Sequence, residues 1–322
     1  MAEGFDVLIS GFATVNHDFT EAAERDLILS PHTAARLVRE SPDLPDPWPE
    51  EARDLLVRLL AAGPGLLPVW ETLEETGALA RLLPEWERVR LLPHASVVHR
   101  FTVDRHLVET CIEASRMIRR VARPDLLLVS ALVHDIGKGG LLEHSVAGEP
   151  IAGELARRLG FSASDAAVVA SLVRWHLLLA EVATTRDLED PATVGHVVER
   201  VSDPLTFDLL TVLTEADGRG RGDEGQGRQA RHADAHQFRE TERGEEHENH
   251  CNDDALRAIK LFTSKVADTI IEASTLATEG AFVSGQGPVV DAADGEYAVV
   301  TEDGMIVTEK GVVNPDNVAS QF

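Results

Sequence analysis

The stretch PDLLLVSALVHDIGKGG (124–140) decides the fold of this chain. It is apolar almost all round up to its histidine, which is typical of a helix buried in the middle of a bundle. Pro124 suits the first position of that helix, and Gly137 is expected to end it. His134 and Asp135 then lie at the end of a buried helix, where polar side chains are costly unless something satisfies them. A divalent metal would satisfy both, because neutral imidazole and carboxylate are good ligands.

Two other predicted helices place a further ligand candidate on an apolar face. His106 lies on the buried side of a helix predicted over 101–121. Asp217 continues the apolar stripe of a helix predicted from Pro204, and an inward Asp needs a partner. Both side chains are therefore candidates to join the His-Asp pair in one metal site.

Three more residues complete the candidate set. His176 continues the apolar face of a helix predicted over 164–179, and His144 is predicted in the loop after Lys138. Each residue alone also fits a simpler interpretation: a buried histidine bonded to a backbone carbonyl, or a solvated cation near a helix end. The simpler interpretation weakens for the whole set, because several independent coincidences would have to fall on facing helices. Lys138 is the candidate contact for a phosphate.

The bulk composition excludes several classes of protein. The formal net charge of −25 over 322 residues disfavours nucleic acid and anionic membranes as partners. Two cysteines, Cys111 and Cys251, give no disulfide framework. The N-terminus lacks the pattern of a signal peptide, and the most apolar stretch, 126–133, is too short to cross a membrane. We therefore expect a cytoplasmic protein with no nucleic acid and no membrane as partner.

The pattern along the chain predicts an all-α fold, since Leu, Val and Ala dominate and aromatic residues are few. After the aspartate at 217 the composition changes abruptly, and 219–254 contains no Val, Leu, Ile or Met, which predicts disorder. The expected parts are an uncertain N-terminal remnant (1–30), a helical linker region (31–92), the bundle with the candidate site (93–218), the disordered polar tract (219–254) and an unassigned tail (255–322). The tail is expected to contain one helix (255–277) and short β-like runs (298–301 and 305–307).

Several segments carry a resemblance to a known family. They are VHRFTVDRH (98–106), ALVHDIGKG (131–139), EHS (143–145), LVRWHLLL (172–179), ATTRDLEDPAT (183–193) and LTEADG (213–218). Together they resemble the HD domain of bacterial bifunctional uridylyltransferase/uridylyl-removing enzymes, which modify the signal protein PII. The resemblance extends upstream and covers about Leu27 to Gly218. The HD motif alone would indicate only a broad superfamily.

The resemblance implies an HD-domain helical bundle and a metal-dependent hydrolase. Its implied metal ligands are His106, His134, Asp135 and Asp217, and its implied supports for a second metal or the phosphate are His144 and His176. The expected catalytic residues are Asp135 and Lys138. Mixed nitrogen and oxygen ligands suit Mg²⁺ or Mn²⁺ first, with Fe or Zn as further options. The implied partner is PII, as the substrate.

The sequence departs from that family at both ends. A nucleotidyltransferase domain needs a Gly-Ser turn and an Asp-x-Asp pair, and the chain contains neither, so transferase activity is not expected. Residues 219–322 do not resemble the glutamine-sensing ACT domains with which the family ends.

The expected reaction is hydrolysis of a nucleotidyl-tyrosine phosphodiester by metal-activated water, which releases UMP or AMP. Lys138 would neutralise charge on the phosphoryl oxygens. Two alternatives stay open: an HD phosphohydrolase that acts on free or cyclic nucleotides, and a catalytically silent remnant that binds PII.

Overall fold

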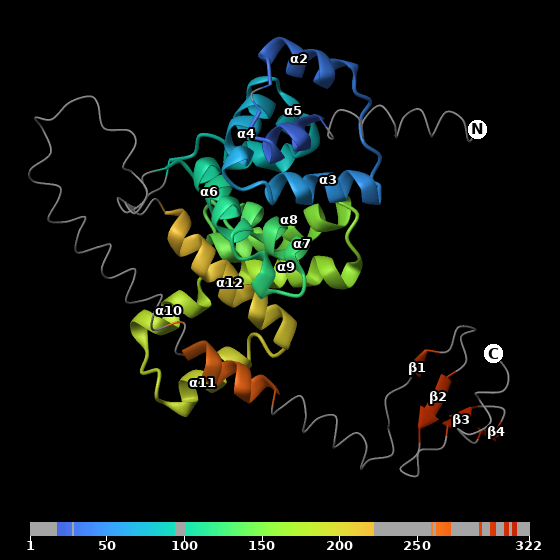
Figure 1. Ribbon diagram of the computed structural model, residues 1–322. Coiled ribbons are helices and arrows are strands. Elements are labelled where there is room, and N and C mark those ends of the chain that lie inside the picture. Colours follow the sequence, from blue (N-terminus) through green and yellow to red (C-terminus); the bar gives the residue numbers. More distant parts are fainter. Residues whose placement is uncertain are drawn as a thin grey trace, which may run out of the picture. The chain divides into compact units, whose positions relative to one another are not determined.

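The structure is a computed structural model, shown in Figure 1. It describes residues 18–27, 29–93, 101–221, 259 and 262–271, and the backbone of four short strands between 290 and 313. The chain divides into two compact units, Met1–Ser264 and Lys265–Phe322. The first unit holds every residue of the candidate site.

Short helices form the N-terminal part of the first unit (Figure 1). Pro31 opens α2 as its sequence predicts, and Glu50 and Glu51 lie in the first turn of α3, where acidic side chains favour the positive end of the helix dipole. Trp70 and Trp86 meet edge to face with ring centroids 5.1 Å apart and are both buried. The elements are α2 (Pro31–Glu40), α3 (Glu50–Leu60), a 3-10 turn (Gly63–Gly65), α4 (Leu66–Glu75), α5 (Ala78–Leu82) and a second 3-10 turn (Pro84–Arg88).

A bundle of longer helices follows. Its members are α6 (Val103–Ser115), α7 (Pro124–Val133), α8 (His144–Arg158), α9 (Ala163–Trp175), α10 (Leu178–Thr185), α11 (Pro191–Val198) and α12 (Pro204–Gly220), with a 3-10 turn at Ile118–Arg120. Helix α7 lies at the centre, where it packs against α6, α8, α9 and α12 (Figure 1). Every residue from Leu126 to Val133 is buried, which explains why this helix is apolar on all sides.

The all-α fold class is confirmed for the described residues of the first unit, which are helical wherever they are regular. Three helix ends differ from the sequence prediction. The helix predicted over 101–121 ends at Ser115, and the one predicted over 164–179 is two helices that meet at His176. Helix α12 runs on to Gly220, into the tract expected to be disordered. The rest of that tract, from 222, lies outside the described residues, as does most of the N-terminal remnant.

The second unit contains an antiparallel sheet of four short strands in sequence order. The strands are β1 (Val290–Asp291), β2 (Tyr297–Val300), β3 (Ile306–Thr308) and β4 (Gly311–Val313). Strands β2 and β3 coincide with the two β-like runs of the sequence, and Val299 pairs with Val307. Residues 262–271 are helical, within the single helix predicted for the tail.

Among the described residues, one stretch, Ala163–Thr185, is long and apolar enough to cross a membrane by length and composition alone. Core helices pass the same test. This stretch forms α9 and α10, and its Val169, Leu172 and Val173 are fully buried.

Candidate metal centre

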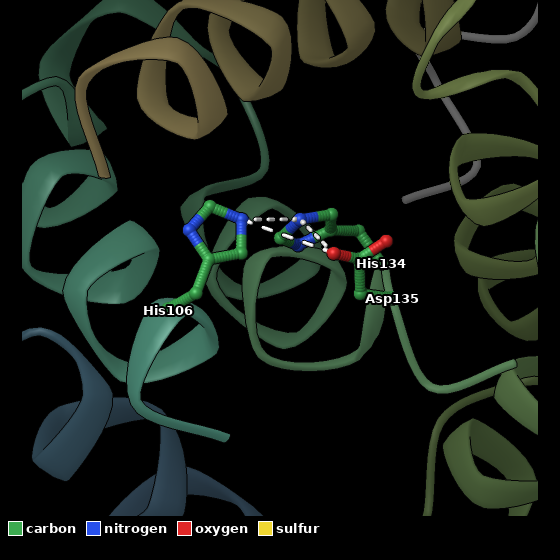
Figure 2. A group of neighbouring side chains, drawn as sticks. All are labelled: His106, His134 and Asp135. Carbon is green, nitrogen blue, oxygen red and sulfur yellow. Dashed lines mark hydrogen bonds and ion pairs between the residues drawn. The ribbon is translucent and has the colours of Figure 1, made fainter. Parts of the chain in front are cut away.

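Three helices of the bundle bring the first group of candidate ligands together. His106 comes from α6, Asp217 comes from α12, and His134 and Asp135 come from the turn that follows α7. All four side chains are almost completely buried. Figure 2 shows His106 pointing toward the His134–Asp135 pair from the opposite helix.

The distances define a compact cluster. His106 Nε2 lies 3.0 Å from Asp217 Oδ1 and 3.9 Å from Asp135 Oδ2. His134 Nε2 lies 3.6 Å from each of the same two carboxylate oxygens. The two imidazole Nε2 atoms are 3.2 Å apart. His106, His134 and Asp135 therefore offer ligand atoms close enough together to share one ion, and Asp217 Oδ1 lies against both imidazoles of this group.

The second group of ligand candidates shares Asp135 with the first. The other carboxylate oxygen of Asp135, Oδ1, lies 3.4 Å from His144 Nε2 and 3.6 Å from His176 Nε2. Those two nitrogens are 3.3 Å apart. Asp135 thus presents Oδ2 to one cluster and Oδ1 to the other, so it belongs to both candidate ligand groups.

Backbone carbonyls fix the orientation of three of the imidazoles. The Nδ1 atoms of His106, His134 and His176 lie 3.2, 3.0 and 2.7 Å from the carbonyl oxygens of Gly220, Ala131 and Val173. A carbonyl oxygen only accepts, so each Nδ1 carries a proton, and in the neutral imidazole Nε2 then turns its unshared pair toward the centre. A metal-binding histidine is commonly held in this way.

This arrangement fits a divalent cation. Nε2 atoms that both carry unshared pairs repel each other when they face at 3.2 or 3.3 Å, unless a proton or a metal ion lies between them. Buried carboxylates at the same point also need a positive partner. Within the described residues, His106, His134 and Asp135 form one group able to hold an ion, and Asp135, His144 and His176 form another.

The electrostatics keep both carboxylates ionised. Burial alone would raise the pKa of Asp135, but His134, His176 and Lys138 outweigh it and hold that pKa far below its usual range. Burial alone would also raise the pKa of Asp217. Arg221, together with His106 and His134, outweighs this effect and lowers that pKa strongly.

The surroundings shift the pKa values of His134 and His176 in opposite directions. Burial would lower the pKa of His134, but Asp135 and Asp217 raise it instead. Burial and the neighbouring His134 lower the pKa of His176 to about 4, so its imidazole is neutral at neutral pH, which is the form that binds metals.

Two cations border the cluster. Lys138 Nζ lies 2.5 Å from Asp135 Oδ2, and this side chain is only partly buried, so it is placed between the carboxylates and solvent. Arg221 Nη2 donates to Asp217 Oδ2 over 2.7 Å. Sequence reasoning missed Arg221, although its position one helical turn after Asp217 is the signal that could have found it.

The structure corrects the sequence prediction for His144. It does not lie in a loop but is the first residue of α8. Glu143 caps this helix, because its carboxylate accepts from the backbone N–H groups of Ser145 and Val146, each at 3.0 Å. These hydrogen bonds hold the pKa of Glu143 at about 2, against the effect of burial. The capped start of α8 thus fixes the position of His144.

The structure brings together all six histidine and aspartate residues named from the sequence, with Lys138 at their edge. His106, His176 and Asp217 are buried as their helical patterns predicted. The sequence did not predict that Asp135 would face both clusters.

Comparison with known proteins identifies the class of this fold and site. A family model described as the HD domain matches residues 103–210, so this part of the chain is an HD domain. Clustered histidine and aspartate side chains of the kind described above are consistent with a metal site typical of such domains.

Three relatives show which enzymes with an HD domain this chain resembles. The chain is 55% identical over 201 residues to a bifunctional uridylyltransferase/uridylyl-removing enzyme of Streptomyces coelicolor, a match that covers 62% of this chain and 24% of the relative. The enzyme of the same name from Mycobacterium tuberculosis H37Rv is 47% identical over 202 residues, covering 62% and 25%. That from Corynebacterium glutamicum is 35% identical over 202 residues, covering 62% and 29%. The chain thus spans only about a quarter of the length of these relatives, and the family resemblance expected from the sequence is confirmed for this region.

Proposed function

We propose that this chain is a metal-dependent phosphodiesterase that removes a nucleotidyl group from a tyrosine of the PII protein. The observation that carries the proposal is the buried cluster of His106, His134 and Asp135 inside an HD domain, with Asp217 against both of its imidazoles. Similarity to enzymes named for uridylyl removal supports the choice of substrate. The phosphodiester is therefore expected to join UMP, or AMP, to the protein.

The residues divide into two ligand groups under this proposal. The first cluster would hold one divalent ion, and His144 and His176 would hold a second ion or a substrate phosphate, with Asp135 shared between them. Nitrogen and oxygen ligands in this mixture suit Mn²⁺ or Mg²⁺ first, and Fe or Zn next.

A bound divalent ion at such a site lowers the pKa of water, so that hydroxide is available near neutral pH. Asp135 is placed to orient that water, because its two oxygens face both clusters. Lys138 is placed to neutralise charge on the phosphoryl oxygens. In the reaction the water oxygen bonds to phosphorus, the bond from phosphorus to the tyrosine oxygen breaks, and the tyrosinate takes up a proton.

Replacing Lys138 by Met tests its assigned role. We expect the turnover of bis-p-nitrophenyl phosphate to fall about 10- to 100-fold, since one charged contact to the phosphoryl group is lost. The metal content of the protein should not change, because Lys138 is not a ligand. Steady-state kinetics combined with elemental analysis check both points, and loss of the metal together with the activity would show that Lys138 supports the ligands instead.

Incubation of the purified chain with uridylylated PII and Mn²⁺ tests the proposed function itself. Release of UMP and a loss of mass from PII are the expected results. Hydrolysis of free or cyclic nucleotides with no release from PII would contradict the proposed substrate. Failure to hydrolyse any phosphodiester would contradict the proposed reaction.

A further inference from the structure

An exposed apolar surface stands beside the metal centre. Leu141 is fully exposed, Leu142 is 70% exposed, and Val146, on the first turn of α8, is 42% exposed. We call these three residues the apolar loop tip. None of the residues that the structure describes covers them, although burying a leucine is normally favourable. Exposed apolar groups that adjoin a polar site commonly mark a surface for another protein.

The loop that carries this tip also carries part of the site. Lys138 begins it, and His144, the first residue of α8, follows it; both lie against the Asp135 carboxylate. Leu141 is three residues from each of them, so it lies within about 10 Å of chain from either. A polypeptide attached to a phosphate held at Lys138 would therefore have the apolar loop tip within reach.

The loop is anchored on both sides. Gly139 has a φ of 85°, and a side chain at this position would meet the Leu92 side chain at 3.2 Å, so the loop packs closely against the segment after the second 3-10 turn. On the other side, Glu143 binds the start of α8, and Arg174 Nη1 donates to Ser145 Oγ over 3.1 Å. The leucines are therefore presented to solvent by a loop that is held at both ends.

We propose that the apolar loop tip is the docking surface for the protein substrate, and that it contacts the polypeptide on either side of the modified tyrosine. This inference rests on the proposed function. A free nucleotide has no apolar chain that continues beyond its phosphate and sugar, whereas a nucleotidylated protein does. The tip thus selects for a phosphodiester carried on a protein, while the buried cluster performs the chemistry.

The double variant Leu141→Ser, Leu142→Ser tests the proposal in the full chain. We expect kcat/KM for uridylylated PII to fall about 10-fold, mainly through a higher KM, because apolar contact area is lost. Hydrolysis of bis-p-nitrophenyl phosphate, which carries no polypeptide, should stay within about twofold of the unsubstituted chain, and so should the metal content. Leu27→Ser is the matched control, since Leu27 is also exposed (52%) but belongs to the N-terminal part of the unit.

The outcomes separate this inference from the proposed function. An unchanged kcat/KM for uridylylated PII in the double variant would overturn the docking surface while leaving the proposed function intact. Equal losses on both substrates would also overturn it, since the loop would then act only by positioning Lys138 and His144. A change in oligomeric state with no kinetic effect would assign the tip to contact between copies of this chain. Failure of the unsubstituted chain to act on uridylylated PII, with bis-p-nitrophenyl phosphate still hydrolysed, would overturn both.

Discussion

The Asp135→Asn variant is expected to lose about a thousandfold or more of its phosphodiesterase activity. Among the described residues, Asp135 is the side chain that belongs to both ligand groups, with Oδ2 toward His106 and His134 and Oδ1 toward His144 and His176. Asparagine has the same size but offers one oxygen and no charge, so it cannot serve both groups. Rates with bis-p-nitrophenyl phosphate at saturating Mn²⁺ measure the loss.

Asp208→Asn provides a matched control for this variant. Asp208 lies on α12, the helix that also carries Asp217, but it is exposed and belongs to neither ligand group. Its substitution is expected to leave the rate within about twofold, because exposed positions away from a site are seldom sensitive. If Asp135→Asn kept a tenth or more of the activity, Asp135 would not be the shared ligand.

The second large effect concerns Gly137, which allows the loop and α8 to pack against the turn after α7. A β-carbon at this position would overlap the His144 carbonyl oxygen and lie 2.5 Å from the Gly148 backbone nitrogen. Both obstacles are backbone atoms, so relief requires α8 to move. Gly137→Ala is therefore expected to lower the free energy of unfolding by about 3 kcal/mol and to displace His144. Urea denaturation measures the first effect, and loss of activity reports the second.

Gly195→Ala should act in the opposite direction. Gly195 lies inside α11, and a β-carbon there would meet nothing within 4 Å. Alanine is the better helix former, so the substitution should stabilise the protein by about 0.5–1 kcal/mol. Equal changes in stability for the two variants would show that Gly137 is not closely packed.

The sequence was most informative where an apolar pattern meets a polar residue. The all-apolar run of α7 predicts its central place, and Pro124 predicts where it begins. Helical spacing alone predicts that the side chains of His106, His176 and Asp217 point into the core. These patterns suffice for a metal-binding helical bundle, because an apolar face with a single titratable group indicates both burial and a partner.

The remaining features depend on contacts between distant segments. The sequence predicts His144 in a loop, whereas Glu143 caps α8 so that His144 is its first residue, and Pro150 lies inside the helix. The shared position of Asp135 depends on how α8 and α9 pack beside α7, which no local pattern encodes. The contact between Arg221 and Asp217 was missed because the change in composition predicted that the helix would already have ended.

Metal content measures the central claim most directly. The purified chain, incubated with Mn²⁺ and then desalted, can be compared by elemental analysis with its Asp135→Asn variant. At least one ion per chain should remain bound to the unsubstituted protein, and the variant should retain far less. A chain that is folded, as judged by its helical circular dichroism, but keeps no stoichiometric ion would contradict a metal centre built from these histidines and aspartates.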